Sequence, residues 1–164
     1  MSGPLSLVVA GLAERLSASR QKLATAESCT GGWIAKACTD VAGSSGWFER
    51  GFVTYSNESK QEMLGVPAEI LDQHGAVSEP VVREMALGAL RYSRAHWSVA
   101  VSGIAGPTGG SADKPVGTVW FAWAGPQQRL LTRSCHFAGD RDAVRRQTVE
   151  MALQVFADLL EGVP

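Results

Sequence analysis

The sequence contains little charge and few cysteines for its 164 residues. Charged residues account for 19% of the chain, the formal net charge is -1 and the isoelectric point is about 6.3. Such a chain has no global field that would attract nucleic acid or an anionic membrane, and it has no basic stretch with interleaved aromatic residues. We therefore expect no nucleic-acid partner and no membrane partner. A charged substrate must be bound by local groups.

Cysteine pairs, targeting segments and long apolar runs are also missing. The three cysteines, Cys29, Cys38 and Cys135, are odd in number and lack the CxxC spacing of a zinc site or a redox pair. The apolar run near the N-terminus is too short to span a membrane, and no basic segment followed by a cleavage site is present. These features predict a cytoplasmic, reducing environment and no bound metal.

The glycine-rich loop 103–110 lacks the signatures of nucleotide cofactors. Its glycines are not followed by Gly-Lys-Ser/Thr, and the loop does not open a helix. Neither ATP nor NAD is implied, and we expect no cofactor. The loop is either a wide hairpin connection or one wall of a site, in which Ser102, Gly103 and the backbone up to Gly106 lie along a substrate.

The sequence does contain an alternation of helix and strand patterns. Apolar periodicity predicts helices at residues 5–16, 33–38, 57–64, 79–94 and 141–160, and a short helical stretch that begins at residue 67. Asn57 is the predicted N-cap of the third helix, and Asp140 is the predicted N-cap of the last. Runs of apolar, aromatic and β-branched residues predict strands at 22–28, 48–55, 97–101, 117–124 and 130–137. Some strands are joined by helices and others by hairpins. The order predicts one α/β domain over residues 1–164, a three-layer α/β/α sandwich with a mixed β-sheet.

Residues 27–32 (ESCTGG) are the most informative segment. A serine at the end of a strand is followed by small residues at the start of a helix, where backbone N–H groups are unpaired. This arrangement suits a nucleophile, Ser28, with oxyanion donors from the following backbone. In the alternative interpretation, Ser28 or Thr30 only caps the helix and the glycines form a tight turn. Glu27 is either a helix-start charge or a partner that holds Lys60.

A serine nucleophile needs a base, and the histidines do not supply one. His74 precedes a glycine, His96 ends a helix and His136 lies in a predicted strand, so no Ser-His-Asp triad is indicated. The alternative base is Lys60, in the first turn of the helix after the strand that ends at Tyr55. Its pKa would have to fall from about 10.4 to about 7 or 8, through burial or a neighbouring positive charge. Otherwise Lys60 is a solvated helix residue and Tyr55 an ordinary strand aromatic.

A third candidate site follows the last predicted strand, where Asp140 opens a helix and three arginines come within two turns. Helix-start N–H groups and guanidinium groups together suit a phosphate, and Arg141 and Arg145 are the candidates. In the alternative interpretation, Arg145 and Arg146 pair with surface carboxylates and Asp140 is only the cap.

Six stretches occur in order along nearly the whole chain: AESCTGG at 26–32, GFVTYSN at 51–57, GAVS at 75–78, SGIAGP at 102–107, KPVGTV at 114–119 and GDR at 139–141. Together they resemble the CinA C-terminal domain family. Longer members of that family carry an additional N-terminal molybdopterin-binding-like domain associated with ADP-ribose pyrophosphatase activity. A chain of 164 residues has no room for that domain, so we do not expect its activity.

The resemblance implies a metal-independent amidase that converts nicotinamide mononucleotide to nicotinate mononucleotide and ammonia, a reaction that recycles the pyridine nucleotide. In the family pattern Ser28 is the nucleophile, and Tyr55 and Lys60 are proton-transfer residues. We expect the backbone near Thr30 and Gly31 to bind the oxyanion.

The remaining predicted contacts concern the nucleotide. Arg141, with Arg145 as second choice, is expected to hold the 5′-phosphate. The loop from Ser102 to Gly106, including Gly103, is expected to line the ribose or the nicotinamide.

Two other functions are open. The same site could hydrolyse a different small amide, which rates on the nucleotide, its riboside and free nicotinamide would distinguish. The chain could also be a ligand-binding or regulatory module, since the family name comes from an association with competence and DNA damage; such a module would bind without releasing ammonia. The small size and the apolar residues of the first helix also predict a symmetric homo-oligomer.

Overall fold

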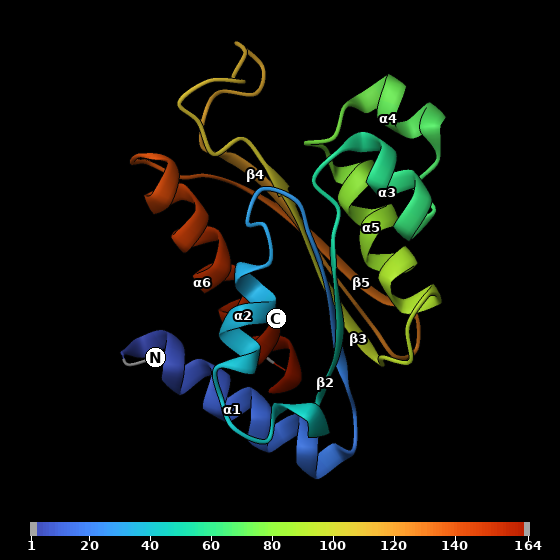
Figure 1. Ribbon diagram of the computed structural model, residues 1–164, viewed down its shortest axis with the longest axis vertical. Coiled ribbons are helices and arrows are strands. Elements are labelled where there is room, and N and C mark those ends of the chain that lie inside the picture. Colours follow the sequence, from blue (N-terminus) through green and yellow to red (C-terminus); the bar gives the residue numbers. More distant parts are fainter. Residues whose placement is uncertain (1–2, 163–164) are drawn as a thin grey trace.

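The computed structural model describes residues 3–162, and five strands form one sheet at its centre (Figure 1). The strands are β1 (Leu23–Glu27), β2 (Phe48–Val53), β3 (Trp97–Gly103), β4 (Thr118–Gly125) and β5 (Arg129–His136). Their order in the sheet is β2-β1-β3-β4-β5. Strand β1 is parallel to β2 and β3, whereas β4 is antiparallel to β3 and β5. The predicted mixed sheet is confirmed.

Helices cover both faces of this sheet, as Figure 1 shows. One face carries α1 (Pro4–Ser19), α2 (Trp33–Thr39) and α6 (Arg141–Leu160), and the other carries α3 (Asn57–Leu64), α4 (Ala68–His74) and α5 (Glu79–Arg91). A short 3-10 helix, η1 (Ser44–Gly46), precedes β2. The three-layer prediction is therefore confirmed. Within residues 3–162, no helix has the length and apolar character needed to cross a bilayer.

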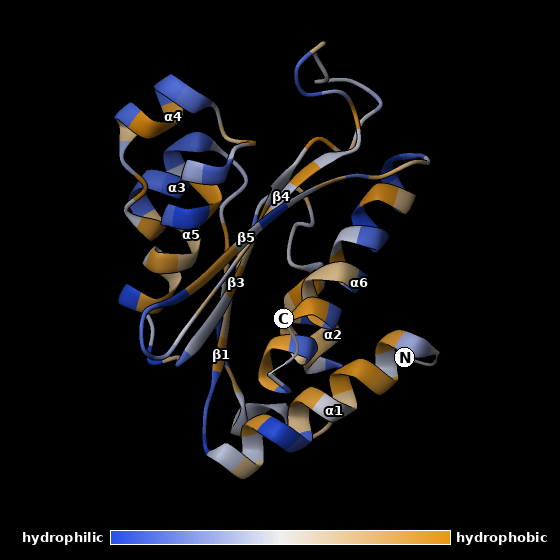
Figure 2. Cartoon of the chain, turned by 180° about the vertical axis from the view of Figure 1, so that it is seen from behind, coloured by the Kyte–Doolittle hydropathy of each residue, from blue (hydrophilic) through white to orange (hydrophobic). Residues whose placement is uncertain are grey.

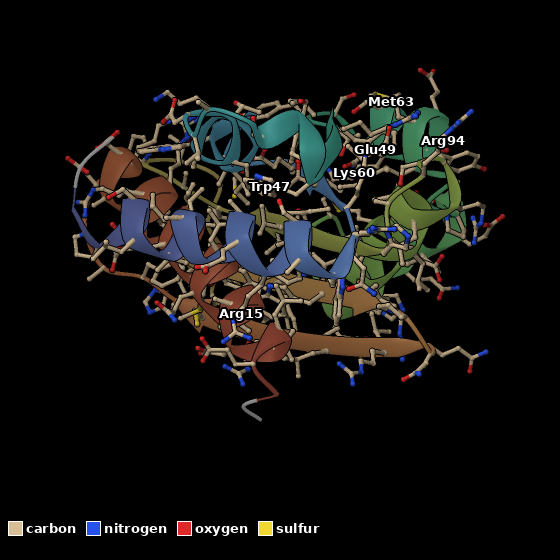
Figure 3. All side chains as sticks on the ribbon, turned by 90° about the horizontal axis from the view of Figure 1, so that it is seen from below. Arg15, Trp47, Glu49, Lys60, Met63 and Arg94 are labelled. Atoms are coloured by element: carbon tan, nitrogen blue, oxygen red, sulfur yellow. The ribbon has the colours of Figure 1, made fainter. Side chains whose placement is uncertain are left out.

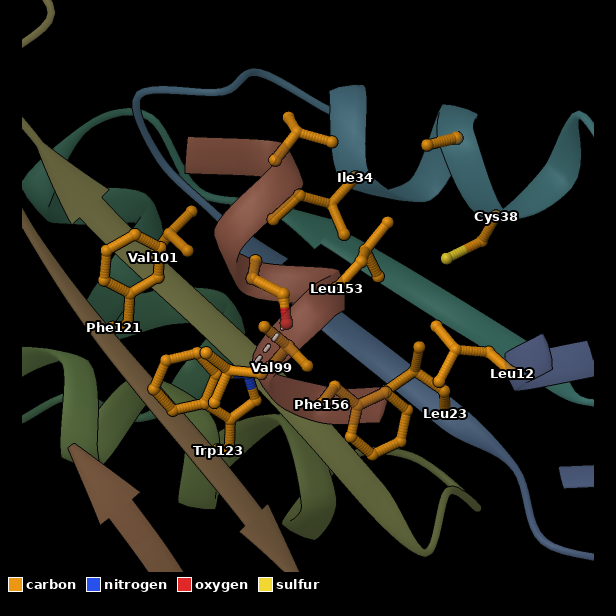
Figure 4. Packing of buried hydrophobic residues seen from close by; sticks show 14 of the residues in the cluster. Leu12, Leu23, Ile34, Cys38, Val99, Val101, Phe121, Trp123, Leu153 and Phe156 are labelled. Atoms are coloured by element: carbon orange, nitrogen blue, oxygen red, sulfur yellow. Dashed lines mark hydrogen bonds between the residues drawn. The ribbon is translucent and has the colours of Figure 1, made fainter. Parts of the chain in front are cut away.

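Two apolar clusters hold the layers together. The larger one lies between the sheet and α1, α2 and α6, and Figure 4 shows its packing around Leu153, Phe156 and Trp123. The smaller one packs α3, α4 and α5 on the opposite face, around Met85 and Leu64. In Figure 2, apolar and polar residues alternate along α1 and α6, as in helices that bury one side. Burial of apolar surface on both faces of the sheet explains the nearly continuous apolar character of β1 and β3.

Several predicted boundaries are wrong. Helix α1 ends at Ser19 rather than Leu16, and β2 ends at Val53, so Tyr55 lies beyond the strand. Ser56, not Asn57, is the N-cap of α3: its backbone is extended, and its Oγ accepts a hydrogen bond from the Ser59 N–H at 3.0 Å. Serine and asparagine cap helices about equally well, so the neighbouring pair was ambiguous in the sequence. Helix α5 ends at Arg91 rather than near Arg94, because Tyr92 has left helical geometry.

The topology determines where a site can form. In the sheet, β1 lies between β2 and β3. The chain passes from β1 through α2 to β2, and then from β2 through α3, α4 and α5 to β3. Because α2 and α3 lie on opposite faces, the connections after β1 and β2 leave the sheet in opposite directions. A crevice forms outside the carboxyl ends of parallel strands at such a point. Residues 28–32 and 54–60 both lie there.

Candidate active site

Ser28 lies at the carboxyl end of β1, where the chain turns into α2. Its N–H still donates to the Val101 carbonyl at 3.2 Å, so the sheet fixes the backbone of this residue. The turn then closes through a hydrogen bond from the Gly31 N–H to the Ser28 carbonyl at 3.1 Å. Gly31 and Gly32 have φ of 60° and 104°, values that favour glycine, so the pair is required for a turn this tight.

Glu27 is the group that caps α2, and this settles one of the alternatives left open by the sequence. The buried carboxylate accepts hydrogen bonds from the Ile34 N–H at 2.8 Å and the Ala35 N–H at 3.0 Å, and also from the Thr30 hydroxyl. It is a helix-start charge and not the partner of Lys60. The Ser28 hydroxyl does not cap the helix.

Lys60 meets the Ser28 hydroxyl inside the protein. Its Nζ lies 2.9 Å from Ser28 Oγ, 2.8 Å from the Thr54 carbonyl oxygen and 3.3 Å from the Tyr55 carbonyl oxygen. Only 1% of Lys60 is exposed, although it sits in the first turn of α3. In Figure 3, Lys60 lies inside the molecule and Met63, from the same helix, lies at its rim. The interpretation of Lys60 as a solvated helix residue is wrong.

Burial changes the protonation of two groups at this site. It lowers the pKa of Lys60 from 10.5 to about 8, because the ammonium form loses its hydration. It also raises the pKa of the neighbouring Cys29 thiol to about 11, so Cys29 is protonated and a weak nucleophile. With a neutral amine, two N–H groups of Lys60 can donate to the two carbonyl oxygens. The lone pair then faces the Ser28 hydroxyl, as a general base requires.

These groups line a cavity of about 210 Å³. Its walls come from five places: the turn after β1, the segment from the end of β2 into α3, the segment between α4 and α5, the end of β3 with the start of the β3–β4 loop, and the start of α6. The lining residues are Ser28, Cys29, Tyr55, Lys60, Ala76, Val77, Ser102, Gly103, Ala105 and Arg141. The predicted residues Ser102 and Gly103 therefore do lie beside Ser28. Ala76 and Val77 were missed as wall residues, since the segment GAVS was noted only for its resemblance.

Tyr55 and Arg141 lie together at the mouth of this cavity. Arg141 donates from Nη2 to the Tyr55 hydroxyl at 3.2 Å and from Nη1 to the Gly106 carbonyl at 2.8 Å. Tyr55 is 62% exposed, and it is its carbonyl, not its phenol, that contacts Lys60. A proton-transfer role for the phenol stays a prediction. Arg141 makes no ion pair with a carboxylate in the part of the chain that the structure describes.

Arg145, the second predicted phosphate ligand, lies behind the turn and does not line the cavity. Its Nε donates to the Cys29 carbonyl at 3.1 Å and its Nη2 to the Thr30 carbonyl at 3.2 Å. Arg146 does not line the cavity either, and its Nη1 lies 3.9 Å from Glu150 Oε1, as expected for a surface pair. Asp140 caps α6 as predicted, through a bond from the Ala143 N–H at 2.9 Å.

A larger hollow, of about 720 Å³, lies over α1, α2 and α6. Apolar residues such as Leu5, Val8 and Met151 form its floor, and its polar groups are helix-surface side chains such as Lys36 and Glu150. Its lining contains no serine, cysteine or buried lysine that would serve as a nucleophile or base. The smaller cavity at Ser28 is therefore the candidate active site.

Comparisons with known proteins agree on one family. The family model described as the CinA C-terminal domain matches residues 7–160. The chain is 64% identical over 141 residues, 86% of either chain, to the nicotinamide-nucleotide amidohydrolase PncC of Escherichia coli K12. It is 54% identical over 150 residues to the protein of the same name from Pseudomonas putida, covering 92% of this chain and 93% of that one. The crystal structure of the competence/damage inducible protein CihA from Agrobacterium tumefaciens superposes with a TM-score of 0.95 at 43% identity, over 97% of each chain.

Proposed function

The chain belongs to the CinA C-terminal domain family, and from this premise we propose that it hydrolyses the carboxamide of nicotinamide mononucleotide with Ser28 as nucleophile. The products are nicotinate mononucleotide and ammonia, so the enzyme is a nicotinamide-nucleotide amidase. The observation that carries the nucleophile assignment is the 2.9 Å contact between Lys60 Nζ and Ser28 Oγ inside a cavity. The thiols Cys29, Cys38 and Cys135 are free, which supports a cytoplasmic location.

In the first half of the reaction, neutral Lys60 takes the hydroxyl proton of Ser28 while Oγ attacks the carboxamide carbon. The bond from Oγ to carbon forms, and the carbonyl oxygen becomes an oxyanion. The resulting ammonium group of Lys60 then gives its proton to the amide nitrogen. The carbon–nitrogen bond breaks, ammonia leaves, and an ester links the nicotinate group to Ser28.

In the second half, a water molecule occupies the place of the departed ammonia. Lys60 takes a proton from this water as it attacks the ester carbon, and returns the proton to Ser28 Oγ when the ester bond breaks. The free enzyme and nicotinate mononucleotide result. The second proton of the water stays on the product acid, which ionises to nicotinate by giving that proton to ammonia or solvent. Lys60 and Ser28 carry the other proton transfers, and no step of this mechanism uses a metal.

The oxyanion is bound by backbone N–H groups of the turn after Ser28. Thr30 was predicted to supply one donor and Gly31 another, but the Gly31 N–H already donates to the Ser28 carbonyl. Within residues 3–162, the N–H groups of Cys29 and Thr30 have no hydrogen-bond partner. These two N–H groups donate to the oxyanion in this mechanism. Gly31 contributes through its left-handed backbone conformation, which the turn after Ser28 requires. A single donor of this kind is worth about 3 kcal/mol of transition-state stabilisation.

The rest of the substrate extends out of the cavity. A volume of about 210 Å³ suits the nicotinamide ring, so the ribose and phosphate lie at the mouth. Ser102 and Gly103 form the wall along the ring and ribose, and Arg141 binds the 5′-phosphate with the phenol of Tyr55 beside it. Arg141 has no carboxylate partner in the described residues, so its charge is available to an anion.

Ammonia release from nicotinamide mononucleotide by chelator-treated protein tests the proposal. We expect metal-independent turnover in the wild type, and a loss of at least 10³-fold in Ser28→Ala, since the nucleophile is removed. Ser45→Ala, at an exposed serine of η1, is the matched control and should retain full activity. A folded wild-type protein without turnover would contradict the amidase and favour a binding or regulatory module.

A further inference from the structure

We propose that Arg145 is a positioning residue, which holds the turn after Ser28 so that two backbone N–H groups face the oxyanion, and that it does not bind the phosphate. The inference deepens the proposed function and rests on it for the identity of the substrate. It reassigns a residue that the sequence suggested as a second phosphate ligand.

The argument begins with the two peptide units that follow Ser28. In a trans peptide, the carbonyl and the N–H of the same unit point in opposite directions. The Cys29 N–H therefore points away from the Ser28 carbonyl, and that carbonyl accepts a hydrogen bond from the Gly31 N–H. The Thr30 N–H points away from the Cys29 carbonyl, and that carbonyl accepts a hydrogen bond from Arg145 Nε at 3.1 Å. The N–H groups of Cys29 and Thr30, which have no partner within residues 3–162, thus each belong to a peptide whose carbonyl accepts a hydrogen bond.

Arg145 holds the next peptide as well. Its Nη2 donates to the Thr30 carbonyl at 3.2 Å, and that carbonyl also accepts from the Trp33 N–H at 3.1 Å. The guanidinium bridges two successive carbonyls, so it fixes the rotation of both peptide planes about the Thr30 Cα. Charge-assisted hydrogen bonds to a carbonyl also polarise the N–H of the same peptide, which strengthens it as a donor.

The position of Arg145 is itself determined by its neighbours. Its guanidinium carbon lies 5.6 Å from the centre of the Trp33 ring, in a cation–π contact. A Cβ on Gly31 would lie 3.6 Å from its Nη2, so the side chain packs directly against the turn. Neither Arg145 nor Arg141 pairs with a carboxylate in the described residues. They differ because Arg141 lines the cavity and Arg145 does not.

Three arginines on α6 allow a matched experiment. Arg145→Met, Arg141→Met and Arg146→Met would be compared by kcat and KM on nicotinamide mononucleotide and on nicotinamide riboside, which has the same carboxamide without the phosphate. For Arg145→Met we expect kcat to fall 10-fold to 100-fold on both substrates, with little change in KM for the nucleotide. For Arg141→Met we expect KM to rise on the nucleotide alone. Arg146→Met should match the wild type.

Two further measurements guard against a folding defect. Thermal unfolding would show whether each variant is folded. Arg145→Lys keeps one charged donor and should recover part of the kcat that Arg145→Met loses. A rise in KM confined to the nucleotide in Arg145→Met would overturn the proposal and make Arg145 a phosphate ligand. An unchanged kcat in a folded Arg145→Met would overturn it too.

Labelling of Ser28 by a fluorophosphonate separates this inference from the proposed function, because the probe needs an activated serine and an oxyanion site but no nucleotide. Slower labelling in Arg145→Met with normal labelling in Arg141→Met supports the positioning role, even if the wild type fails to hydrolyse the mononucleotide. Equal labelling rates in the wild type and both variants would overturn it.

Discussion

Lys60 shows how burial converts a common surface residue into a base. Its ammonium form is disfavoured because it loses hydration, and the carbonyls of Thr54 and Tyr55 accept hydrogen bonds from it without adding a full negative charge. A carboxylate partner in their place would raise the pKa of Lys60 and keep it protonated. Glu27, the nearest acidic residue in sequence to Ser28, is directed to the start of α2 instead.

The pH dependence of turnover follows from this environment. Lys60 must be neutral to accept the proton of Ser28, and its pKa is lowered to about 8, so lowering the pH below that value removes the base. We expect kcat/KM to rise about tenfold per pH unit up to a pH of about 8 and then to level off. Initial rates of ammonia release between about pH 6.5 and 9.5 would measure this. A profile that falls with rising pH across this range would contradict Lys60 as the base.

At the scale of elements, the start of α2 supports the nucleophile. The helix is only seven residues long, its N-cap residue is a glycine without a side chain to cap it, and Glu27 satisfies its first N–H groups from the preceding strand. The same carboxylate binds the hydroxyl of Thr30 in the turn. Strand, turn and helix are thus joined at one buried group, with Ser28 between them.

Replacing Glu27 by glutamine tests this junction. The amide keeps the shape of the side chain but presents N–H groups to backbone donors, so one buried partner loses its acceptor. We expect the free energy of unfolding to fall by about 1 to 3 kcal/mol, with a lower kcat because the turn shifts. Urea denaturation and ammonia release would measure both effects. Glu62→Gln, at an exposed residue of α3, is the control; an equal loss in both variants would refute a specific role for Glu27.

At the scale of the whole molecule, the two apolar clusters hold the two halves of the site together. Ser28 is followed by α2 on one face of the sheet, and Lys60 lies in α3 on the other, so their contact depends on both layers packing on the same strands. The exposed Leu7 of α1 and the large hollow beside that helix lie away from the active site. A symmetric homo-oligomer remains a prediction.

Truncation of a central core residue should weaken the whole domain. Leu153 of α6 is fully buried in the larger cluster (Figure 4), and we expect Leu153→Ala to lower the free energy of unfolding by about 2 to 5 kcal/mol, because it leaves a cavity. Leu7→Ala, at a residue that is 75% exposed, should change it by less than about 0.5 kcal/mol. Tryptophan fluorescence during urea unfolding measures both. A near-zero effect at Leu153 would contradict the packing described.

The sequence by itself determined the class of the fold, the order of its elements and the identity of Ser28 and Lys60 as candidates. These depend on local patterns: apolar periodicity, turn residues and a serine between a strand and a helix. It did not determine the N-cap of α3, since Ser56 and Asn57 are both good caps. It also left the roles of Glu27 and Arg145 open.

Only the tertiary structure decided those roles, because each depends on groups that are distant in sequence or on burial. Lys60 and Ser28 are separated by 32 positions, and Arg145 and Cys29 by 116. Spacing along the chain carries no information about whether such side chains meet. The packing of helices on both faces of the sheet brings them together, and the resulting loss of water around Lys60 lowers its pKa.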